Sequence, residues 1–281
     1  MNRLSDPELW EYIRQDLPYF DLTTRLLETP AEPALLHILT RHEVVAACTE
    51  EAGRIGELLG CRVRGSVASG ETVEAGGVLL TLEGNGPDLH GAWRAAQILM
   101  EYACGIATYA ARMRRAAAAE NPHCEVFTTR KSFPFAKRFV VRALLCGGIM
   151  PHRLGLSETV LVFDKHRSLF ADADVEGAFR ALKRRCIEKK LVAEAESLEE
   201  AARFAEWGAD VIQLDKCDAA TLREAVALRD AGFPHLRLLA AGGVNLQNVA
   251  EYAATGVDGI VTSSPYQAAK AADLTARWER P

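Results

Sequence analysis

After Asn121-Pro122 the sequence alternates short apolar runs with longer amphipathic runs, and this alternation limits the fold more than any other feature. Short apolar runs predict strands, whereas apolar residues spaced three or four apart predict helices. Strands that alternate with helices form parallel βα units. The predicted strands are residues 124–129, 159–163, 191–195, 211–214, 236–240 and 259–262, and the predicted helices are 136–146, 175–188, 198–207, 219–231 and 246–254.

Such units form either an α/β barrel or a doubly wound open sheet. Polar or glycine residues follow the carboxyl end of each predicted strand: Arg130-Lys131, Asp164-Lys165-His166, Glu194 and Glu196, Asp215-Lys216, Gly242-Gly243 and Ser263-Ser264. In a barrel these ends meet at one mouth, while an open sheet concentrates them near one switch point. We therefore favour a barrel, and an incomplete one, because six units are visible rather than eight.

The first part of the chain is organised differently. Ser5 and Glu8 have the spacing of a capping box and predict a short helix. Residues 34–80 mix strand-like runs with a helical run at 50–59, and the glycine spacing in 70–80 is hairpin-like. This segment lacks the modifiable Met-Lys pair of a lipoyl carrier, so we read it as a structural sheet. An alanine-rich helical run at 89–120, broken near Gly105, would connect two domains.

Composition excludes several classes of protein. The 33 Lys and Arg against 38 Asp and Glu give a net charge of -5, so no global excess of positive charge exists for nucleic acid or an acidic membrane. No stretch approaches the roughly 20 apolar residues of a membrane span, and the start of the sequence is polar. Seven cysteines without a C-x-x-C pair argue against a disulfide framework and a cysteine zinc site. We expect a cytoplasmic protein.

The residues at the strand ends suit one kind of chemistry. Arg130, Lys131, His152, Arg153, Lys165 and Lys216 supply cations or donors, and Asp164, Glu194, Glu196 and Asp215 supply carboxylates. Gly242-Gly243 before a helix can present N–H groups to a phosphate, and Ser263-Ser264 can add hydroxyl donors. Cations, a phosphate cradle and carboxylates fit a phosphorylated substrate with Mg²⁺.

Each signal also has a plain structural explanation. Two glycines often form a tight turn, charged residues at strand ends are often solvated, and His152 alone is more often structural. Glu194 and Glu196 alternate along one strand and would be surface carboxylates, unless Glu194 faces the barrel interior, where it needs a partner. The recurrence of such residues after all six strands favours a single site.

Several motifs resemble those of the quinolinate phosphoribosyltransferase family. The most specific are Thr129-Arg130-Lys131 and the run from Gly147-Gly148 to His152-Arg153, and the match continues in order over nearly the whole chain. Supporting runs are residues 18–24, 104–108, 127–134, 146–156, 213–215 and 256–258. Within the family, residues 147–159 are most similar to the ModD branch, the pyrophosphorylases associated with molybdenum transport operons.

The resemblance implies an α/β fold with two parts, an N-terminal α/β sandwich domain and an open α/β barrel. It places the sandwich with its linking helix at 1–112 and the barrel at 113–265, and residues 266–281 would return to the first domain. It also implies a homodimer in which Arg94 reaches the partner's active site. Higher homo-oligomers stay open.

The resemblance also implies the role of each site residue. Arg130, His152 and Arg153 match residues that hold the acceptor's carboxylates, and Lys131 lies beside them. Glu194 and Asp215 match the acidic pair near the ribose and the Mg²⁺ ion, which they would bind directly or through water. Gly242, Gly243, Ser263 and Ser264 occupy the region of the 5′-phosphate.

The chain departs from the family pattern in its acceptor region. Phe163, followed by Asp164-Lys165-His166, stands where related enzymes have a lysine, and Val192 stands where they have the first glutamate of a Glu-x-Glu motif. Lys216 replaces an asparagine, and Ala240-Ala241 replace Ala-Ser. Binding of the phosphoribosyl group is therefore expected to be retained, and acceptor recognition altered, with Phe163 and Lys165 lining the acceptor pocket.

The sequence thus predicts a phosphoribosyltransferase that transfers a 5-phosphoribosyl group from phosphoribosyl pyrophosphate to a small, anionic nitrogen heterocycle. One alternative is nicotinate-nucleotide pyrophosphorylase (carboxylating), the quinolinate enzyme of NAD biosynthesis. A second is a ligand-binding protein that keeps the fold without turnover. The presence of Glu194 and Asp215 favours catalysis.

Overall fold

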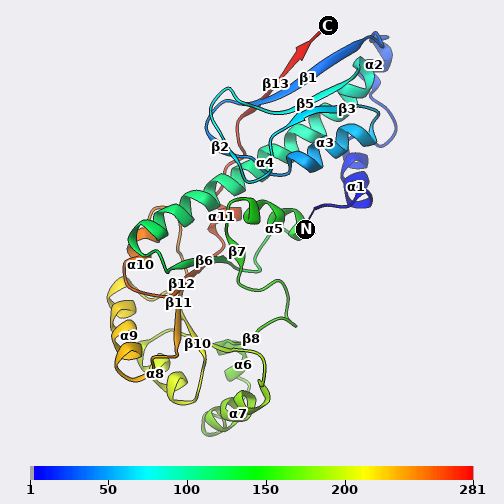
Figure 1. Ribbon diagram of the computed structural model, residues 1–281. Helices are drawn as coiled ribbons and strands as arrows, with labels where there is room; N and C mark the ends of the chain where they lie inside the picture. Colours follow the sequence, from blue (N-terminus) through cyan, green and yellow to red (C-terminus); the bar gives the residue numbers. More distant parts are fainter. Residues whose placement is uncertain (1–2, 281) are drawn as a thin grey trace. The chain divides into compact units, whose positions relative to one another are not determined.

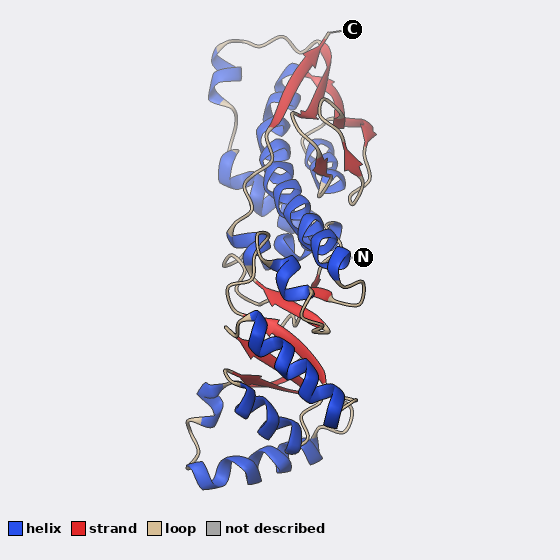
Figure 2. Ribbon diagram, turned by 90° about the vertical axis from the view of Figure 1, so that its left-hand side faces the viewer, coloured by secondary structure: helices blue, strands red, loops and turns tan. Residues whose placement is uncertain are grey.

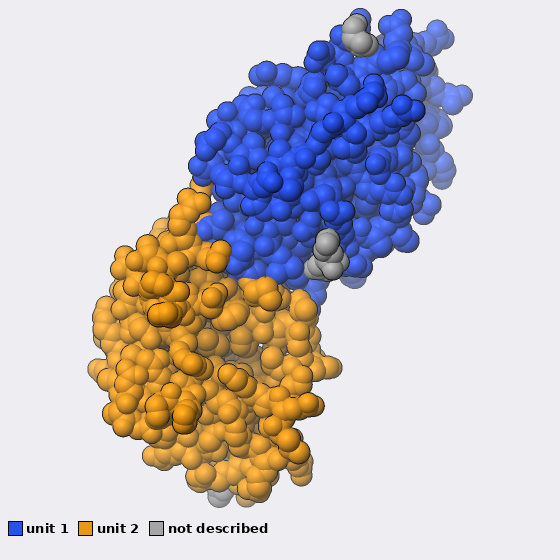
Figure 3. Space-filling model, viewed as in Figure 1, with its two compact units in different colours: residues 1–111, 132–149, 268–281 blue, residues 112–131, 150–267 orange. Residues whose placement is uncertain are grey.

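The computed structural model describes residues 3–280 and divides into two compact units. Unit 1 comprises residues up to 111 together with 132–149 and 268–280, and unit 2 comprises 112–131 and 150–267 (Figure 3). Residues 132–149 therefore belong with unit 1, whereas the resemblance places them in the barrel domain. Met1, Asn2 and Pro281, which fall in the first and last predicted segments, lie outside the described residues.

Unit 1 is built on an antiparallel sheet with the strand order β13-β1-β5-β3. Its strands are β1 (Pro33–Thr40), β3 (Arg62–Ser66), β5 (Val78–Asn85) and β13 (Leu274–Glu279). The last strand pairs with the first, so the C-terminal segment closes one edge of this sheet (Figure 1). A separate pair joins β2 (Val44–Val45) to β4 (Thr72–Val73). The hairpin predicted at 70–80 is wrong, because β4 and β5 belong to different sheets.

Four helices complete most of unit 1: α1 (Asp6–Asp16), α2 (Leu22–Leu26), α3 (Thr49–Leu58) and α5 (Lys137–Cys146). The predicted capping box is present, since the Ser5 N–H and hydroxyl both donate to the Glu8 carboxylate.

Helix α4 (Gly86–Glu120) contributes residues to both units and runs unbroken for 35 residues. The break predicted at Gly105 is wrong. A Cβ at this position would lie 2.1 Å from the Lys270 carbonyl oxygen, so glycine is required by the close approach of the chain before β13. Gly105 is a contact point on an intact helix rather than a helix end.

Unit 2 is a seven-stranded parallel sheet with the order β7-β6-β12-β11-β10-β9-β8. Its strands are β6 (Glu125–Thr128), β7 (Met150–Pro151), β8 (Val160–Val162), β9 (Leu191–Ala195), β10 (Val211–Asp215), β11 (Arg237–Ala241) and β12 (Gly259–Thr262). The sheet curls but β7 and β8 remain its two edges, which confirms the open α/β barrel.

Helices α8, α9 and α10 pack along the strands of unit 2, as Figure 1 shows, and Figure 2 distinguishes helices from strands by colour. The helices of unit 2 are α6 (Asp164–Arg167), α7 (Asp172–Arg185), α8 (Leu198–Glu206), α9 (Ala219–Gly232), α10 (Val249–Ala253) and α11 (Ser264–Gln267). The inner core contains Leu161, Val192, Val211, Leu239, Ala241 and Val261, with Phe127 and Phe163 packed against it. Within residues 3–280, no helix is long and apolar enough to cross a membrane.

Candidate active site

Glu194 lies on the inner face of the barrel near the carboxyl end of β9. It shares that face with Val192 of the inner core, two residues earlier. Gln213, its neighbour in register on β10, donates from Nε2 to the Glu194 carboxylate at 3.2 Å. Glu194 is therefore not a surface carboxylate. Gln213 is the hydrogen-bond partner that a carboxylate facing the barrel interior requires.

The charges around Glu194 define its electrostatic environment. Burial raises the pKa of this carboxyl, and the negative charges of Asp215 and Glu196 raise it further. The positive charges of Arg167 and Lys131 lower the pKa of Glu194. Glu194, Asp215 and Lys131 are thus close enough to influence one another, in agreement with their predicted convergence.

Asp215 ends β10 at a point where the backbone turns sharply. Lys216 adopts a left-handed conformation (φ 58°), and its N–H donates to the Ala241 carbonyl at 2.8 Å. Its Nζ lies 3.5 Å from Asp215 Oδ2, with the side chain mostly exposed. A Cβ on Gly242 would lie 2.6 Å from the Lys216 nitrogen and 2.9 Å from Asp215 Oδ1, so only glycine fits beside this turn.

The two glycines after β11 both have positive φ, 86° for Gly242 and 75° for Gly243. A Cβ on Gly243 would meet no atom within 4 Å, and neither glycine N–H donates to an acceptor within the described part of the chain. These two donors therefore remain available to a ligand.

The helix expected to begin at Leu246 instead begins at Val249 as α10 and has only five residues. The reason is local hydrogen bonding. The Asn248 side chain accepts from the Asn245 N–H, and the Asn245 side chain accepts from the Gln247 N–H. Asn side chains compete in this way with helical bonding. The glycines consequently lack the helix dipole that the sequence had suggested directly behind them.

The two serines after β12 differ in accessibility. The Ser263 hydroxyl donates to Gln267 Oε1 at 2.5 Å on the surface. Ser264 is buried, and its hydroxyl lies 3.4 Å from the Met113 sulfur. Ser263 is therefore better placed than Ser264 to contact a ligand.

Arg130 and Lys131 follow β6 on a loop that Tyr266 fixes. The Tyr266 hydroxyl donates to the Thr129 carbonyl at 2.7 Å and lies 2.6 Å from Thr129 Oγ1, which also accepts from the Lys131 N–H at 3.2 Å. Both basic side chains are exposed. Tyr266 was not foreseen from the sequence, because nothing in its spacing links it to a residue 137 positions earlier.

His152 and Arg153 follow the short edge strand β7. Burial lowers the pKa of His152, and the neighbouring Arg153 charge lowers it further. Arg153 is only 7% exposed, and its pKa is lowered by burial and by Arg130. It forms no ion pair or hydrogen bond with any residue in 3–280, so two neighbouring guanidinium groups lack an anion.

Phe163, directly after β8, contacts Arg153 with its ring. Its ring lies 5.3 Å from the Arg153 guanidinium carbon and stacks on the His166 ring at 5.6 Å. Its backbone N–H donates to His166 Nδ1. An aromatic face thus contacts the unpaired guanidinium at the position where the sequence departs from the family pattern.

Lys165 does not lie beside Phe163. We expected an extended segment that would place both side chains on the same side, but α6 begins at Asp164. Lys165 is 93% exposed, and its nearest acidic oxygen is Asp164 Oδ2 at 3.9 Å. The expectation that it lines the pocket is therefore not supported by the geometry. Arg167, which the sequence did not single out, donates to the Glu194 carbonyl at 3.2 Å.

Arg94 belongs to unit 1, on α4. Its side chain is exposed, and the guanidinium carbon lies 4.4 Å from the centre of the Trp93 ring. Its predicted role in a partner subunit's site stays a prediction.

Sequence profiles match almost the whole chain. The profile described as "Quinolinate phosphoribosyl transferase, C-terminal domain" matches residues 106–277, and that of the N-terminal domain matches residues 21–104. A pyrophosphorylase ModD from Pasteurella multocida is 38% identical over 266 residues, which cover 94% of each chain. A pyrophosphorylase ModD from Rhodobacter capsulatus is 41% identical over 251 residues, which cover 88% of this chain and 95% of the relative.

Solved structures share the same fold. The nicotinate-nucleotide pyrophosphorylase from Francisella tularensis superposes with a TM-score of 0.88 and covers 99% of this chain and 98% of its own. At 21% sequence identity this similarity concerns the fold alone.

Proposed function

Because the chain belongs to the quinolinate phosphoribosyl transferase family, we propose that it transfers a 5-phosphoribosyl group from phosphoribosyl pyrophosphate to a ring nitrogen of a small anionic acceptor. One observation supports this most strongly: the guanidinium groups of Arg130 and Arg153 lie close together without an anion, and Lys131 and Asp215 lie close enough to Glu194 to shift the pKa of its carboxyl. The cations suit an anionic acceptor, and the carboxylates suit a developing cation.

In the reaction, the bond between C1 of the ribose and the pyrophosphate oxygen breaks, and a bond forms between C1 and the acceptor nitrogen. Positive charge develops on the ribose ring, and fixed carboxylates lower the barrier electrostatically. Glu194 and Asp215 serve this role. Lys131, whose charge reaches Glu194, neutralises the departing pyrophosphate. Gly242, Gly243 and Ser263 hold the 5′-phosphate through their free donors and hydroxyl.

Mg²⁺ fits the same carboxylates. The negative charge of Asp215 raises the pKa of Glu194, and a bound cation held by these carboxylates would reduce this repulsion. No group of three acidic, His or Cys side chains placed to hold a metal exists in residues 3–280, so Glu194 and Asp215 would hold Mg²⁺ together with substrate phosphates and water. When bound, Mg²⁺ supplies charge neutralisation for the pyrophosphate.

The acceptor differs from quinolinate. Phe163 offers an aromatic face where related enzymes have a lysine, so the pocket suits an acceptor with fewer carboxylates and an exposed ring face. The alternative is the carboxylating nicotinate-nucleotide pyrophosphorylase, and the Francisella structure is named as a nicotinate-nucleotide pyrophosphorylase. The link to molybdenum transport, expected from the ModD branch, stays a prediction that molybdate uptake in a deletion strain would test.

A screen of aromatic acids and nitrogen heterocycles for pyrophosphate release from phosphoribosyl pyrophosphate tests the proposal. We expect at least one acceptor to be turned over and quinolinate to be used poorly. Phosphoribosyl pyrophosphate with Mg²⁺ should also raise the melting temperature, since a hundredfold excess over Kd adds about 2.7 kcal/mol to the free energy of unfolding. Failure of both measurements would contradict the proposal, and efficient use of quinolinate would favour the alternative.

The proposal includes a homodimer. Large apolar side chains gather on the exposed surface of unit 1 along residues 19–27, where Tyr19 is 90% and Leu26 73% exposed. Such a cluster favours burial against another chain. If Arg94 acts in the partner's site, mixing Arg94→Ala with Asp215→Asn protein should restore up to roughly a quarter of the activity, because a mixed dimer holds one intact site. No recovery after subunit exchange would contradict the shared site.

A further inference from the structure

Arg167 is a largely buried arginine beside the candidate site to which the proposed reaction gives no role. It is the last residue of α6, and only 12% of its side chain is exposed. Its guanidinium carbon lies 4.8 Å from the centre of the Phe204 ring. A charge that leaves water is costly unless other groups compensate it. The partners of Arg167 therefore indicate what the side chain does in this fold.

Arg167 contacts β9 at the point where that strand loses its neighbour β8. The register of β8 with β9 ends at Val162, opposite Ala193, because the chain then turns into α6. The carbonyl of Glu194, one residue further along β9, accepts from Arg167 Nη1 at 3.2 Å. On its other side β9 still pairs with β10, where Gln213 is in register with Glu194. The guanidinium thus takes the place of a strand neighbour at Glu194.

The same guanidinium is linked to the next residues of the chain through Glu200. Arg167 Nη2 lies 3.5 Å from Glu200 Oε1, and the second oxygen of this carboxylate accepts from the Glu196 N–H at 3.0 Å. Glu200 itself is held in the first turn of α8, because its N–H donates to the Ser197 hydroxyl at 3.2 Å. One ion pair therefore fixes both the carbonyl of Glu194 and the N–H of Glu196.

A fixed backbone at Glu194 limits where its carboxylate can lie. Gln213 Nε2 donates to the carboxylate at 3.2 Å, and Arg167 holds the carbonyl of the same residue. Groups that act in a reaction must be kept close to their productive geometry, and a displacement of about 1 Å can cost roughly 10²-fold in rate. Loss of the Arg167 contacts would free the end of β9 and allow such a displacement.

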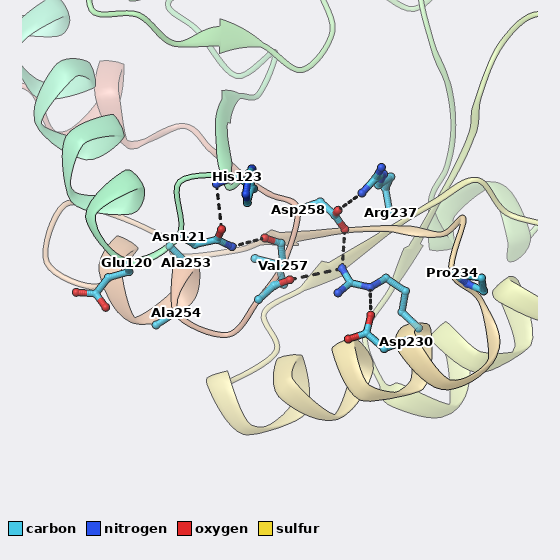
Figure 4. A pocket seen from close by; sticks show the side chains of 12 residues that line it. Glu120, Asn121, His123, Asp230, Pro234, Arg237, Ala253, Ala254, Val257 and Asp258 are labelled. Carbon is cyan, nitrogen blue, oxygen red and sulfur yellow. Dashed lines mark hydrogen bonds and ion pairs between the residues drawn. The ribbon is translucent and has the colours of Figure 1, made fainter.

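Arg229 provides a comparison, because its surroundings are alike but lie near the amino ends of the strands. It pairs with Asp230 and Asp258, whose ion pairs Figure 4 shows, and it donates to the Gly256 carbonyl at 3.5 Å. Its side chain is 15% exposed. Arg167 likewise contacts two carboxylates and one carbonyl. The two arginines differ in position, since Arg167 holds a strand end beside the candidate site.

We propose that Arg167 is a positioning residue, which fixes the end of β9 and thereby keeps the Glu194 carboxylate in place for the reaction. The inference rests on the proposed function, in which Glu194 stabilises the positive charge that develops on the ribose. Arg167 acts through Glu194 and Glu200 rather than by contact with a substrate. Its loss should therefore slow the chemical step, while the acceptor, held by Arg130 and Arg153, binds as before.

Steady-state kinetics test the proposal, with phosphoribosyl pyrophosphate and the best acceptor from the screen described above. Arg167→Met removes the donors but keeps an unbranched side chain that can pack on Phe204. It should lower kcat about tenfold and leave the KM of the acceptor within twofold of wild type. Arg167→Lys, which keeps the charge, should lose less. The matched control, Arg229→Met, should lower the melting temperature and leave kcat unchanged.

A double substitution tests whether Arg167 acts through Glu194. In the Glu194→Gln protein the carboxylate that Arg167 positions is already gone, so Arg167→Met should cause little further loss of the residual turnover. Substitutions that act through one group are not additive, whereas independent ones are. A purely structural role of Arg167 would instead lower turnover by the same factor in both backgrounds.

Hydrogen exchange gives a measurement that does not depend on turnover. The Glu196 N–H should exchange several-fold faster in Arg167→Met and at the wild-type rate in Arg229→Met, because the former loses the cation that holds Glu200.

Three results would overturn the inference. They are a kcat of Arg167→Met within twofold of wild type, unchanged exchange at Glu196, and an equal loss of turnover in the wild-type and Glu194→Gln backgrounds. A wild-type protein that turns over no acceptor would reject the proposed function instead, and the exchange rates would still decide whether Arg167 holds the end of β9.

Discussion

At the amino ends of the barrel strands charged side chains pair with one another, whereas at the carboxyl ends several are left unpaired. Asp258, before β12, accepts from Arg237 at 2.6 Å, from Arg229 at 2.9 Å and from the Leu238 N–H at 2.8 Å. Burial opposes its ionisation, but these donors hold the pKa of Asp258 below its ordinary value. Arg153, after β7, is more deeply buried and has no such partner.

The comparison separates stabilising charge from functional charge. A buried charge with several partners supports the fold, whereas a buried charge without one is tolerated when a ligand completes it. Substitutions at the two ends should therefore change different properties.

The largest effect is expected for the carboxylates at the carboxyl ends. Asp215→Asn and Glu194→Gln should each lower turnover by at least roughly 10²-fold, about 2.7 kcal/mol of transition-state stabilisation, with little loss of folding stability. Steady-state pyrophosphate release and thermal melting measure the two properties. Turnover within a few-fold of wild type in both variants would remove this pair from the mechanism.

At the amino ends of the barrel strands, a substitution should instead lower folding stability and leave turnover unchanged. Asp258→Asn removes the carboxylate of Arg237 and the more buried of the two carboxylates of Arg229, and should lower the free energy of unfolding by about 2 kcal/mol. The melting temperature would fall by roughly 4–8 °C, with turnover at low temperature unchanged. Asp230→Asn is the matched control, because Asp230 also pairs with Arg229 but is 62% exposed and should matter much less. Equal losses in both variants would contradict the assigned role of burial.

A third substitution changes the residue that contacts the unpaired Arg153 guanidinium. Phe163→Lys adds a charge beside Arg153 and should raise quinolinate affinity about tenfold, through one charge-assisted contact to a carboxylate. Phe163→Leu, which removes the ring without adding charge, is the control. A wild-type protein that uses quinolinate efficiently, together with no gain in Phe163→Lys, would identify an ordinary quinolinate enzyme.

The smallest effect concerns pH. Because burial and Asp215 raise the pKa of Glu194, the folded state holds this proton more tightly than the unfolded chain does. Folding stability linked to Glu194 is therefore present in acid and is lost as pH rises from the ordinary glutamate pKa through the raised value. Glu194→Gln should be more stable than wild type above that range and equal to it below. Melting curves from pH 4 to 8 measure the difference, and a constant offset would contradict the linkage.

Much of the barrel follows from the sequence, since each apolar run such as 191–195 or 211–214 becomes one inner strand. The two-residue strand β7 is too short to give a pattern. Asn245 and Asn248 delay a helix through side-chain bonds that no periodicity shows. Gly105 has the usual signature of a break, but it serves packing against Lys270, which is distant in sequence.

The residues of the candidate site also divide into those that could be predicted from the sequence and those that could not. Glu194 and Asp215 were predictable, because each is the charged residue at or next to the carboxyl end of a strand. Gln213 could have been found from its spacing, since it lies two residues before Asp215 and so on the same strand face. Lys165 was misplaced because the segment after β8 turns into a helix at once. The free guanidinium of Arg153 depends on three-dimensional burial and has no sequence signal.

The pairing of β1 with β13 has a consequence for the order of assembly. His37 Nε2 lies 3.1 Å from a Glu279 carboxylate oxygen across this pair of strands, although the two residues are 242 positions apart in the chain. During synthesis, one edge of β1 therefore keeps its backbone N–H and C=O groups uncovered until all of the barrel has been made. Uncovered strand edges invite pairing with other chains, and distant contacts form slowly. The nascent chain is thus most open to aggregation through its first strand, and that exposure ends only when its last strand arrives.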